Sequence, residues 1–367
     1  MDMICDRSGY NDSIFSWPTT APPPLGDALL RAAPEDFVVD EEIDIALSGV
    51  GEHLWLQLRK RGANTEYVAR QLARAAGVPI RAVSYAGMKD RHAVATQWFS
   101  VHLPGRETPN LGAQLPPEIE LLSSQRHARK LQRGALRGNR FELTLRECRG
   151  DREGLLTRAA EIAAHGVPNY FGEQRFGRNQ SNIVRAAEMF AGAVVRQRHL
   201  RGLYLSAARS LLFNQVLAQR VRDGSWNRAL DGEAFSLNGS NSFFVADDVD
   251  ESIQRRLGEG DIHASGPLWG RGAPPTRAAA RVLELKVARD HPELSEGLAR
   301  AGLAQERRAL RLIPRALQAQ WLDATTLHLR LSLPAGSYAT AVLRELAGYR
   351  EGRATDVATA DGDLGRE

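Results

Sequence analysis

The chain has 367 residues, of which 43% are hydrophobic and 25% are charged, a composition typical of a folded globular protein, and its length favours two domains over one. Two cysteines, Cys5 and Cys148, and nine scattered histidines exclude a disulfide framework and give no support to a metal site. No apolar run reaches the roughly 18 residues that a membrane span needs, so we expect no membrane association and a reducing, cytoplasmic location.

The first 166 residues alternate between strand-like and helix-like patterns. Residues 64–77 are predicted to form a helix, because Asn64 is a suitable N-cap, apolar residues recur behind it at helical spacing, and Gly77 ends the pattern. Residues 151–166 are predicted to form a second helix that closes at Gly166. The predicted strands cover residues 35–43, 52–60, 81–87, 96–103, 118–129 and 139–148.

The sequence pattern changes after residue 166, where a stretch rich in glycine, aromatic and amide residues shows no clear helical or strand period. Helices are predicted over 182–193, 206–222 and 337–349, and strands over 307–314 and 325–334. A sheet that begins before residue 150 and resumes after 305 predicts an insertion. We therefore expect a first domain in two pieces, 28–164 and 314–350, and a second domain, 165–313, inserted into it. Residues 1–27 are expected to be a flexible lead-in and residues 351–367 a disordered tail.

The cations are unevenly placed. Only four of the 48 basic residues are lysines, a bias that genome composition alone can produce, although arginine also suits forked contacts with phosphate. The segment "RHARKLQRGALRGNR" (126–140) holds six cations and no acid. A solvated charged surface is the ordinary explanation, but the interleaved Gly134, Gly138 and Asn139 favour a loop that contacts nucleic-acid phosphates. The residues expected to contact the backbone are Arg129, Lys130, Arg133 and Arg137.

The segment "SYAGMKDRHAVATQWFSV" (84–101) places one carboxylate, Asp90, between Lys89 and Arg91 in a loop that joins two predicted strands. Such a residue is usually part of a surface ion pair. Here Gly87 permits a sharp turn, and a nearby cation would hold the carboxylate ionised, as a nucleophile or base requires. No His–Ser, His–Cys or paired-carboxylate arrangement of recognisable spacing competes with it. These features favour a functional role for Asp90 over a surface ion pair.

The pattern "AGMKDRHAVATQWFSV" resembles the signature of the TruD family of tRNA pseudouridine synthases. Further blocks resemble family blocks in the family order: "PEDFVVDE", "KLQRGALRGNRFEL", "GVPNYFGEQRFG", "GDIHASGPLWG", "ERRALRL" and "LPAGSYATAVLREL". The resemblance covers residues 28–349. It implies an α/β (α+β) protein: a pseudouridine synthase catalytic domain with a mixed, largely antiparallel sheet and flanking helices, plus an inserted α/β TRUD domain, in a V shape with a central RNA-binding cleft.

The resemblance also implies a function. The family isomerises a tRNA uridine, conventionally number 13, to pseudouridine without a cofactor or metal, and Asp90 matches its catalytic aspartate. Attack on the ribose C1′ and removal of the C2′ proton both remain open as the first step. We expect a cytoplasmic monomer that binds tRNA and takes the target base out of the stack. The alternatives are a non-catalytic RNA-binding protein that retains the fold and an aspartate-dependent enzyme acting on a nucleoside or sugar.

Further positions match the family's substrate pocket. Phe37 would offer a stacking face, and Asn139 with Phe141, two apart on a predicted strand, would present an amide beside a ring. Tyr338 stands where phenylalanine is usual, so its hydroxyl needs a partner, and Arg31 stands where lysine is common. Lys89 is expected to contact either the substrate or a phosphate. In the inserted domain, His263 is expected to be structural or to contact RNA rather than to act as an acid.

Overall fold

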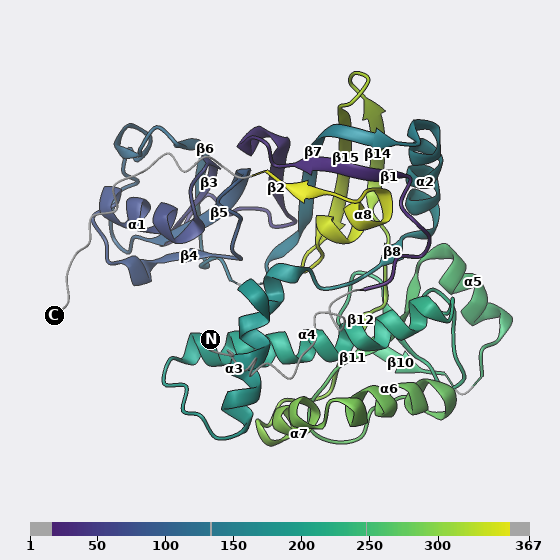
Figure 1. Cartoon of the computed structure of the whole chain (residues 1–367). Coiled ribbons are helices and arrows are strands. Elements are labelled where there is room, and N and C mark those ends of the chain that lie inside the picture. Colours follow the sequence, from purple (N-terminus) through teal and green to yellow (C-terminus); the bar gives the residue numbers. More distant parts are fainter. Residues whose placement is uncertain (1–16, 133, 247, 353–367) are drawn as a thin grey trace, which may run out of the picture. The chain divides into compact units, whose positions relative to one another are not determined.

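The computed structural model describes residues 17–132, 134–246 and 248–352. Cys5, Arg133 and most of the predicted lead-in and tail lie outside these residues. The described chain forms two compact units, which we call the sheet unit (24–159, 315–336 and 347–352) and the helical unit (17–23, 160–314 and 337–346) (Figure 1). Residues 337–346 thus group with the helical unit, whereas the sequence assigned 314–350 to the catalytic domain as one block. The predicted domain boundaries stay a prediction.

One large mixed sheet organises the sheet unit. Its central path runs β14-β15-β7-β2-β5-β3-β6, and β1, β4 and β16 pair beside it. The strands are β1 (Leu25–Leu30), β2 (Phe37–Ile43), β3 (His53–Arg61), β4 (Val83–Tyr85), β5 (Val94–His102), β6 (Ile119–His127), β7 (Leu136–Gly150), β14 (Arg315–Trp321), β15 (Leu327–Pro334) and β16 (Arg350–Glu351).

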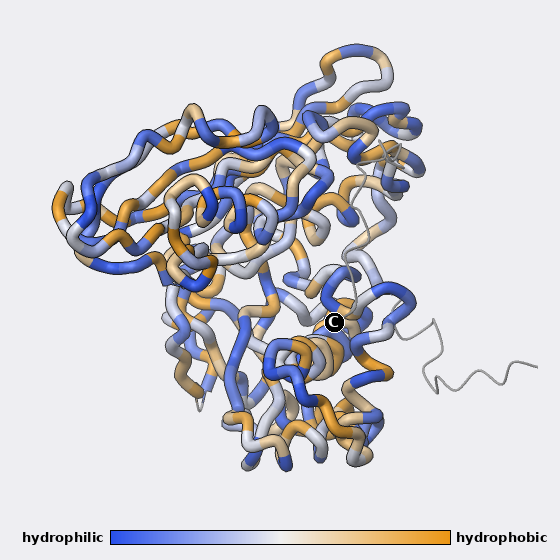
Figure 2. Tube along the Cα trace, turned by 90° about the vertical axis from the view of Figure 1, so that its left-hand side faces the viewer, coloured by the Kyte–Doolittle hydropathy of each residue, from blue (hydrophilic) through white to orange (hydrophobic). Residues whose placement is uncertain are grey.

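The pairing is mostly antiparallel, which confirms the predicted sheet type. Only β2 with β5 and β1 with β16 run parallel among the described strands. Side chains alternate between buried and more exposed along β15, and Figure 2 shows hydrophobic and hydrophilic residues alternating along the trace. β15 pairs with β7 from Leu327 opposite Leu145 to Pro334 opposite Gly138, so the sheet does resume far along the chain, as the sequence predicted.

Helix α1 (Thr65–Ala75) covers part of this sheet. Its predicted N-cap is confirmed, because the Asn64 side chain accepts a hydrogen bond from the Tyr67 amide at 2.7 Å. Val68 and Leu72 are fully buried against strand residues such as Leu56 and Phe99. The N-terminal end of α1 is thereby fixed beside the loop that carries Asp90.

The helical unit is built around α4 (Arg198–Arg222), which lies among α3 (Ser181–Phe190), α6 (Ala278–Asp290) and α7 (Pro292–Arg300) (Figure 1). Its remaining helices are α5 (Glu251–Glu259) and α8 (Ala339–Leu346), and α2 (Arg152–His165) leads into it along the chain. A four-stranded sheet has the order β10-β9-β11-β12, and β13 pairs with β8; the bounds are β8 (Val167–Pro168), β9 (Ala234–Leu237), β10 (Phe243–Val245), β11 (Ile262–Leu268), β12 (Glu306–Ala309) and β13 (Arg311–Leu312).

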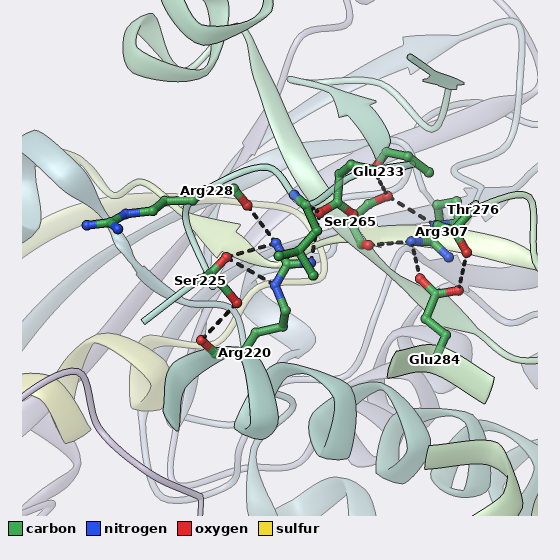
Figure 3. A network of polar contacts seen from close by, with 10 residues as sticks. Arg220, Ser225, Arg228, Glu233, Ser265, Thr276, Glu284 and Arg307 are labelled. Carbon is green, nitrogen blue, oxygen red and sulfur yellow. Dashed lines mark hydrogen bonds and ion pairs between the residues drawn. The ribbon is translucent and has the colours of Figure 1, made fainter. Parts of the chain in front are cut away.

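A buried network of charged side chains crosses the interior of the helical unit (Figure 3). Arg220 bonds Glu233 at 2.7 Å and Arg307 bonds Glu284 at 2.8 Å, all four side chains being almost fully buried. Thr276 and Ser265 supply further hydrogen bonds to Glu284 and Arg307. Burial raises the pKa of Glu233, and the Arg220 charge opposes that rise. Removing one partner would leave a buried charge uncompensated, so this network is a structural element of the fold.

Within the described residues, every helix is too short or too polar to cross a membrane.

Candidate active site

Asp90 lies in the loop between β4 and β5, and buried polar side chains hold the backbone of that loop. The Lys60 ammonium, on β3, donates to the carbonyl oxygens of Ala63 at 2.6 Å and Asp90 at 2.7 Å. Thr65, at the start of α1, accepts a hydrogen bond from the Lys89 amide at 2.9 Å. The position of Asp90 is therefore set by interior groups on β3 and α1.

Gln97 on β5 continues this support. Its amide nitrogen donates to the Gly87 carbonyl at 2.7 Å, and its amide oxygen accepts from the Thr65 hydroxyl at 3.0 Å. The chain bends at Gly87, but the glycine does not adopt left-handed backbone, and no atom lies within 4 Å of where a Cβ would stand. Gly87 therefore permits the bend without being required for it, and buried hydrogen bonds shape the loop.

The cation that pairs with Asp90 is Arg31, which is distant in sequence. Arg31 Nη2 lies 2.7 Å from Asp90 Oδ2, and the aspartate side chain keeps 36% of its surface exposed. The sequence-adjacent cations have other contacts: Lys89 turns inward, and Arg91 Nε donates to the Gly62 carbonyl at 3.3 Å. The expected charge pairing exists, but its partner differs from the flanking residues that suggested it. A carboxylate in this setting is paired with a cation and still partly exposed.

Arg31 is itself held on three sides. Its guanidinium lies 4.1 Å from the centre of the Phe37 ring, Nη2 contacts Asp90, and Nη1 contacts Glu351 Oε1 at 2.6 Å. The residue is buried and has φ of 59°, in the left-handed region that non-glycine residues seldom occupy. Such a conformation costs about 1–3 kcal/mol and persists where surrounding contacts impose it.

A second buried cluster adjoins the loop. The Lys89 ammonium bonds Asn139 Oδ1 at 2.7 Å and lies 2.9 Å from Glu41 Oε1. Glu41 Oε2 accepts a hydrogen bond from the Trp98 amide at 2.8 Å. Burial raises the pKa of Glu41, and the charge of Lys89 opposes that rise. Because an ammonium only donates, the amide oxygen of Asn139 must face Lys89, and its NH₂ group must point elsewhere.

Lys60 is fully buried between this cluster and the loop. Desolvation lowers the pKa of Lys60 to about 8, with the charge of Asp90 opposing the shift and the charge of Lys89 adding to it. Either protonation state has enough N–H donors for the two backbone carbonyls that Lys60 contacts. The loop anchor therefore does not depend on the charge of Lys60.

The two predicted pocket rings meet each other. Phe37 on β2 and Phe141 on β7 pack edge to face, with centroids 6.0 Å apart and an interplanar angle of 79°. Asn139 and Phe141 lie two apart on β7 and are both buried, as their spacing predicted. One face of Phe37 carries the Arg31 guanidinium, so in this structure that ring orients the arginine. The structure brings together Arg31, Phe37, Lys89, Asp90, Asn139 and Phe141.

Tyr338 belongs to the helical unit, and its surroundings lie there. The Arg175 guanidinium donates to the Tyr338 hydroxyl, which supplies the partner that the sequence required. The ring packs edge-on against Phe171 at 6.1 Å, and Arg308 lies over the Phe171 ring at 4.2 Å. Burial lowers the pKa of Arg308 to about 10. Tyr338 is thus part of an arginine-rich aromatic cluster.

The basic segment divides between a loop and a strand. Arg129 and Lys130 are exposed in the loop after β6, whereas Arg137 is exposed on β7, 4.0 Å from Asp44. Gly138 and Asn139 lie inside β7, so they are not part of a loop, and contact of the segment with phosphate stays a prediction. At Gly138 a Cβ would stand 2.4 Å from the Leu333 carbonyl oxygen on β15, which explains the glycine by close strand packing.

His263 is buried on β11 and accepts a hydrogen bond at Nδ1 from Arg311 Nε at 3.2 Å. Desolvation, followed by the charge of Arg311, lowers the pKa of His263 to about 4. The imidazole is therefore neutral and structural. Across residues 17–132, 134–246 and 248–352, no three His, Cys, Asp or Glu side chains gather as metal ligands.

Sequence reasoning missed three members of the site: Glu41, Lys60 and Glu351. One signal was available. In a chain with only four lysines among 48 basic residues, two of them, Lys60 and Lys89, lie in this site. Both supply a compact ammonium where a larger guanidinium would have to fit among buried groups. Glu351 carried no such signal, because it follows Arg31 by 320 residues.

Comparison with known proteins identifies the family of this chain. The family model described as tRNA pseudouridine synthase D (TruD) matches residues 19–191 and 183–346. A tRNA pseudouridine synthase D from Nitrosococcus oceani is 52% identical over 90% of this chain and 93% of its own length, and one from Hydrogenovibrio crunogenus is 49% identical over 88% and 93%.

A solved structure assigned to tRNA pseudouridine synthase D from Methanosarcina mazei shares the fold, with a TM-score of 0.68 and 22% identity over 91% of this chain and 96% of that one. The family match spans most of the residues that form both units, including every residue of the Asp90 site except Glu351. This chain therefore belongs to the tRNA pseudouridine synthase D (TruD) family.

Proposed function

We propose that this chain isomerises uridine 13 of tRNA to pseudouridine, with Asp90 as the catalytic carboxylate and without a cofactor. The observation that carries the proposal is the pairing of a partly exposed Asp90 with a buried Arg31 on a loop held by Lys60, Thr65 and Gln97. This arrangement keeps the carboxylate in a fixed position beside a cation. Family membership supplies the reaction class and the tRNA substrate.

The reaction rearranges bonds within one nucleotide. The C1′–N1 glycosidic bond breaks, the uracil turns, a C1′–C5 bond forms, C5 loses its proton and N1 gains one. Because Arg31 bonds Oδ2 of Asp90, we assign Oδ1 to the ribose. There it either attacks C1′ or removes the C2′ proton. Both routes need one carboxylate oxygen that can act as a nucleophile or base.

The neighbouring groups suit a flipped-out uracil. Lys89 fixes the Asn139 oxygen, so the Asn139 NH₂ group is the part that can donate to a uracil carbonyl. Phe37 and Phe141 provide the apolar wall of the pocket. Tyr338 is proposed to stack on the substrate as well, with its hydroxyl held by Arg175. Arg129, Lys130, Arg133 and Arg137 are proposed to contact the tRNA backbone.

The predicted alternatives are weaker. A non-catalytic RNA-binding protein has no support from the family comparison, and the site retains Asp90 with its cation. An enzyme acting on a free nucleoside would have no use for the exposed cations Arg129 and Lys130. We further propose that the chain acts as a monomer and that it is located in the cytoplasm. The scarcity of cysteine supports the proposed location.

Asp90→Asn tests the proposal. The variant keeps the shape but loses the ionised oxygen, so pseudouridine formation should fall at least about 1,000-fold, equivalent to about 4 kcal/mol of transition-state stabilisation. Release of tritium from tRNA labelled at uridine C5 measures the rate, and filter binding measures tRNA affinity, which should change less than threefold. Asp40→Asn, on β2, is the matched control and should retain activity. Full activity in Asp90→Asn would refute the assignment of Asp90.

A further inference from the structure

One guanidinium in the active site is shared by two carboxylates. Arg31 presents Nη2 to Asp90 at 2.7 Å and Nη1 to Glu351 at 2.6 Å, while its flat face lies 4.1 Å from the centre of the Phe37 ring. Glu351 comes from the far end of the described chain and is separated from Arg31 by 320 residues. Since Asp90 touches one end of the fork and Glu351 the other, the two acids are linked through a single rigid group.

The backbone of the terminal strand brings Glu351 close to Arg31. β16 pairs in parallel with β1, with Leu30 opposite Glu351, and the Gly352 amide donates to the Leu30 carbonyl at 2.7 Å. A Cβ at Gly352 would lie 2.5 Å from the Arg31 carbonyl oxygen, so the chain can approach Arg31 this closely only with glycine at that position. The terminal strand thus delivers its carboxylate to the residue that pairs with Asp90.

Arg31 needs such a constraint because its own backbone and side chain provide little. Its φ of 59° is unfavourable for a non-glycine residue, and an arginine side chain has many rotamers to lose on ordering. Stacking on Phe37 fixes the plane of the guanidinium but leaves it able to turn within that plane. A bond from Nη1 to Glu351 removes this rotation and aims Nη2 at Asp90.

We infer that Glu351 is a positioning residue: it holds the guanidinium of Arg31 in the orientation that keeps Asp90 Oδ2 bonded and Oδ1 aimed at the ribose. The inference rests on the proposed function, because the rate of uridine isomerisation is its readout. A lysine at position 31 would have one compact ammonium instead of a fork, and it would not need a second carboxylate to aim it at Asp90. The effect of Glu351 should therefore exist only with arginine at position 31.

The test is a double-mutant cycle on the full chain, with Glu351→Gln, Arg31→Lys and the double variant. Glu351→Gln should lower the single-turnover rate of tritium release about tenfold, less than the roughly 100-fold that a 1 Å misplacement of a catalytic group can cost. Affinity for tRNA should change less than twofold. In the Arg31→Lys background, adding Glu351→Gln should change the rate less than twofold.

Arg350→Gln is the matched control, because Arg350 lies on the same strand and contacts Glu147 and Asp27 instead of Arg31. It should leave the rate unchanged, because it removes neither contact that orients the Arg31 guanidinium. An equal loss from Glu351→Gln in both position-31 backgrounds, no loss with Arg31 present, or the same loss in Arg350→Gln would overturn the inference. None of these outcomes touches the proposed function, which fails only if Asp90→Asn remains active.

Discussion

Lys60 is a buried side chain that supports the active site but does not contact substrate in the proposed reaction. Its ammonium bridges the carbonyls of Ala63 and Asp90, so it ties the loop to the end of β3. Burial lowers the pKa of Lys60 to about 8, because the charged form loses its hydration. The residue therefore stabilises loop geometry through hydrogen bonds while its charge is unfavourable to folding.

This opposition predicts an unusual pH dependence of stability. With a folded pKa near 8 and an unfolded pKa of 10.5, the cost of charging Lys60 is fully present below pH 8 and is relieved as pH rises toward 10.5. The free energy of unfolding of the wild type, minus that of Lys60→Gln, should therefore rise between pH 7 and 10. The expected rise is on the order of 2–3 kcal/mol, from about 1.4 kcal/mol per pKa unit.

Urea denaturation at a series of pH values measures this difference. Lys286→Gln, which alters a lysine on α6 in the helical unit, is the control and should give a difference that does not change over the same range. A pH-independent difference for Lys60→Gln as well would show that Lys60 titrates at its ordinary value.

At the residue scale, the sequence led to Asp90 as the proposed catalytic carboxylate but not to the groups that surround it. Asp90 was proposed from a local loop pattern, and the shared face of Asn139 and Phe141 was predicted from the two-residue period of a strand. The cation that pairs with Asp90 was first sought among its chain neighbours, whereas sheet pairing supplies Arg31. Long-range partners such as Glu351 are set by which strands pair, and a single sequence does not contain that information directly.

At the scale of elements, β7 is the strand on which the site depends most. It pairs with β15 on one side and β2 on the other, and Asn139 and Phe141 both lie on it. Gly138 faces Pro334 and Glu42 across these two pairings. Because a Cβ there would lie 2.4 Å from the Leu333 carbonyl, this glycine permits the close approach that places Asn139 beside Lys89.

Gly138→Ala should therefore destabilise the fold by about 1–3 kcal/mol, the usual cost of forcing extra atoms into a packed interior. Gly87→Ala is the matched control for stability, since Gly87 has no left-handed backbone and no atom within 4 Å of its Cβ position. It should change the free energy of unfolding by less than about 0.5 kcal/mol. Urea denaturation measures both, and similar values for the two variants would contradict the steric explanation.

Several of the elements that sequence patterns missed have a thin or absent apolar stripe, or an irregular register. β14 has no fully buried residue, and α5 has only Leu257. β1 contains a Gly-Asp pair and irregular register with β7, and β16 has two residues. α4 begins at Arg198, whereas the prediction began at Ser206. The prediction missed the first two turns because they are mostly exposed and carry no clear apolar stripe. β11 was missed although six of its seven residues are buried, because continuous burial produces no alternating pattern for such a search to detect.

At the scale of the whole molecule, each unit closes on its own core. Leu54, Leu56 and Phe99 belong to a core in the sheet unit, whereas Leu211, Phe213 and Leu217 on α4 belong to the core of the helical unit. The chain leaves the sheet unit after residue 159 and re-enters it at Arg315, where β14 and β15 complete the sheet beside β7. The unit that carries Asp90 therefore depends on segments far apart in the sequence.

The exposed cations of the sheet unit give the last prediction. Arg129 and Lys130 stand exposed on the loop after β6, and each is proposed to contact one tRNA phosphate. Neutralising a phosphate releases condensed counterions, so the slope of log affinity against log salt concentration changes by roughly 0.7–0.9 for each contact. Arg129→Ala with Lys130→Ala should therefore reduce the steepness of that slope by about 1.4–1.8 and weaken tRNA binding most at low salt. Filter binding over a range of salt concentrations measures this slope.

The control is Arg185→Ala with Arg300→Ala, which removes the same charge. These two exposed arginines pair within their own helices with Glu188 and Glu296. An equal change of slope in both double variants would mean that overall charge, rather than the loop after β6, sets the affinity for tRNA.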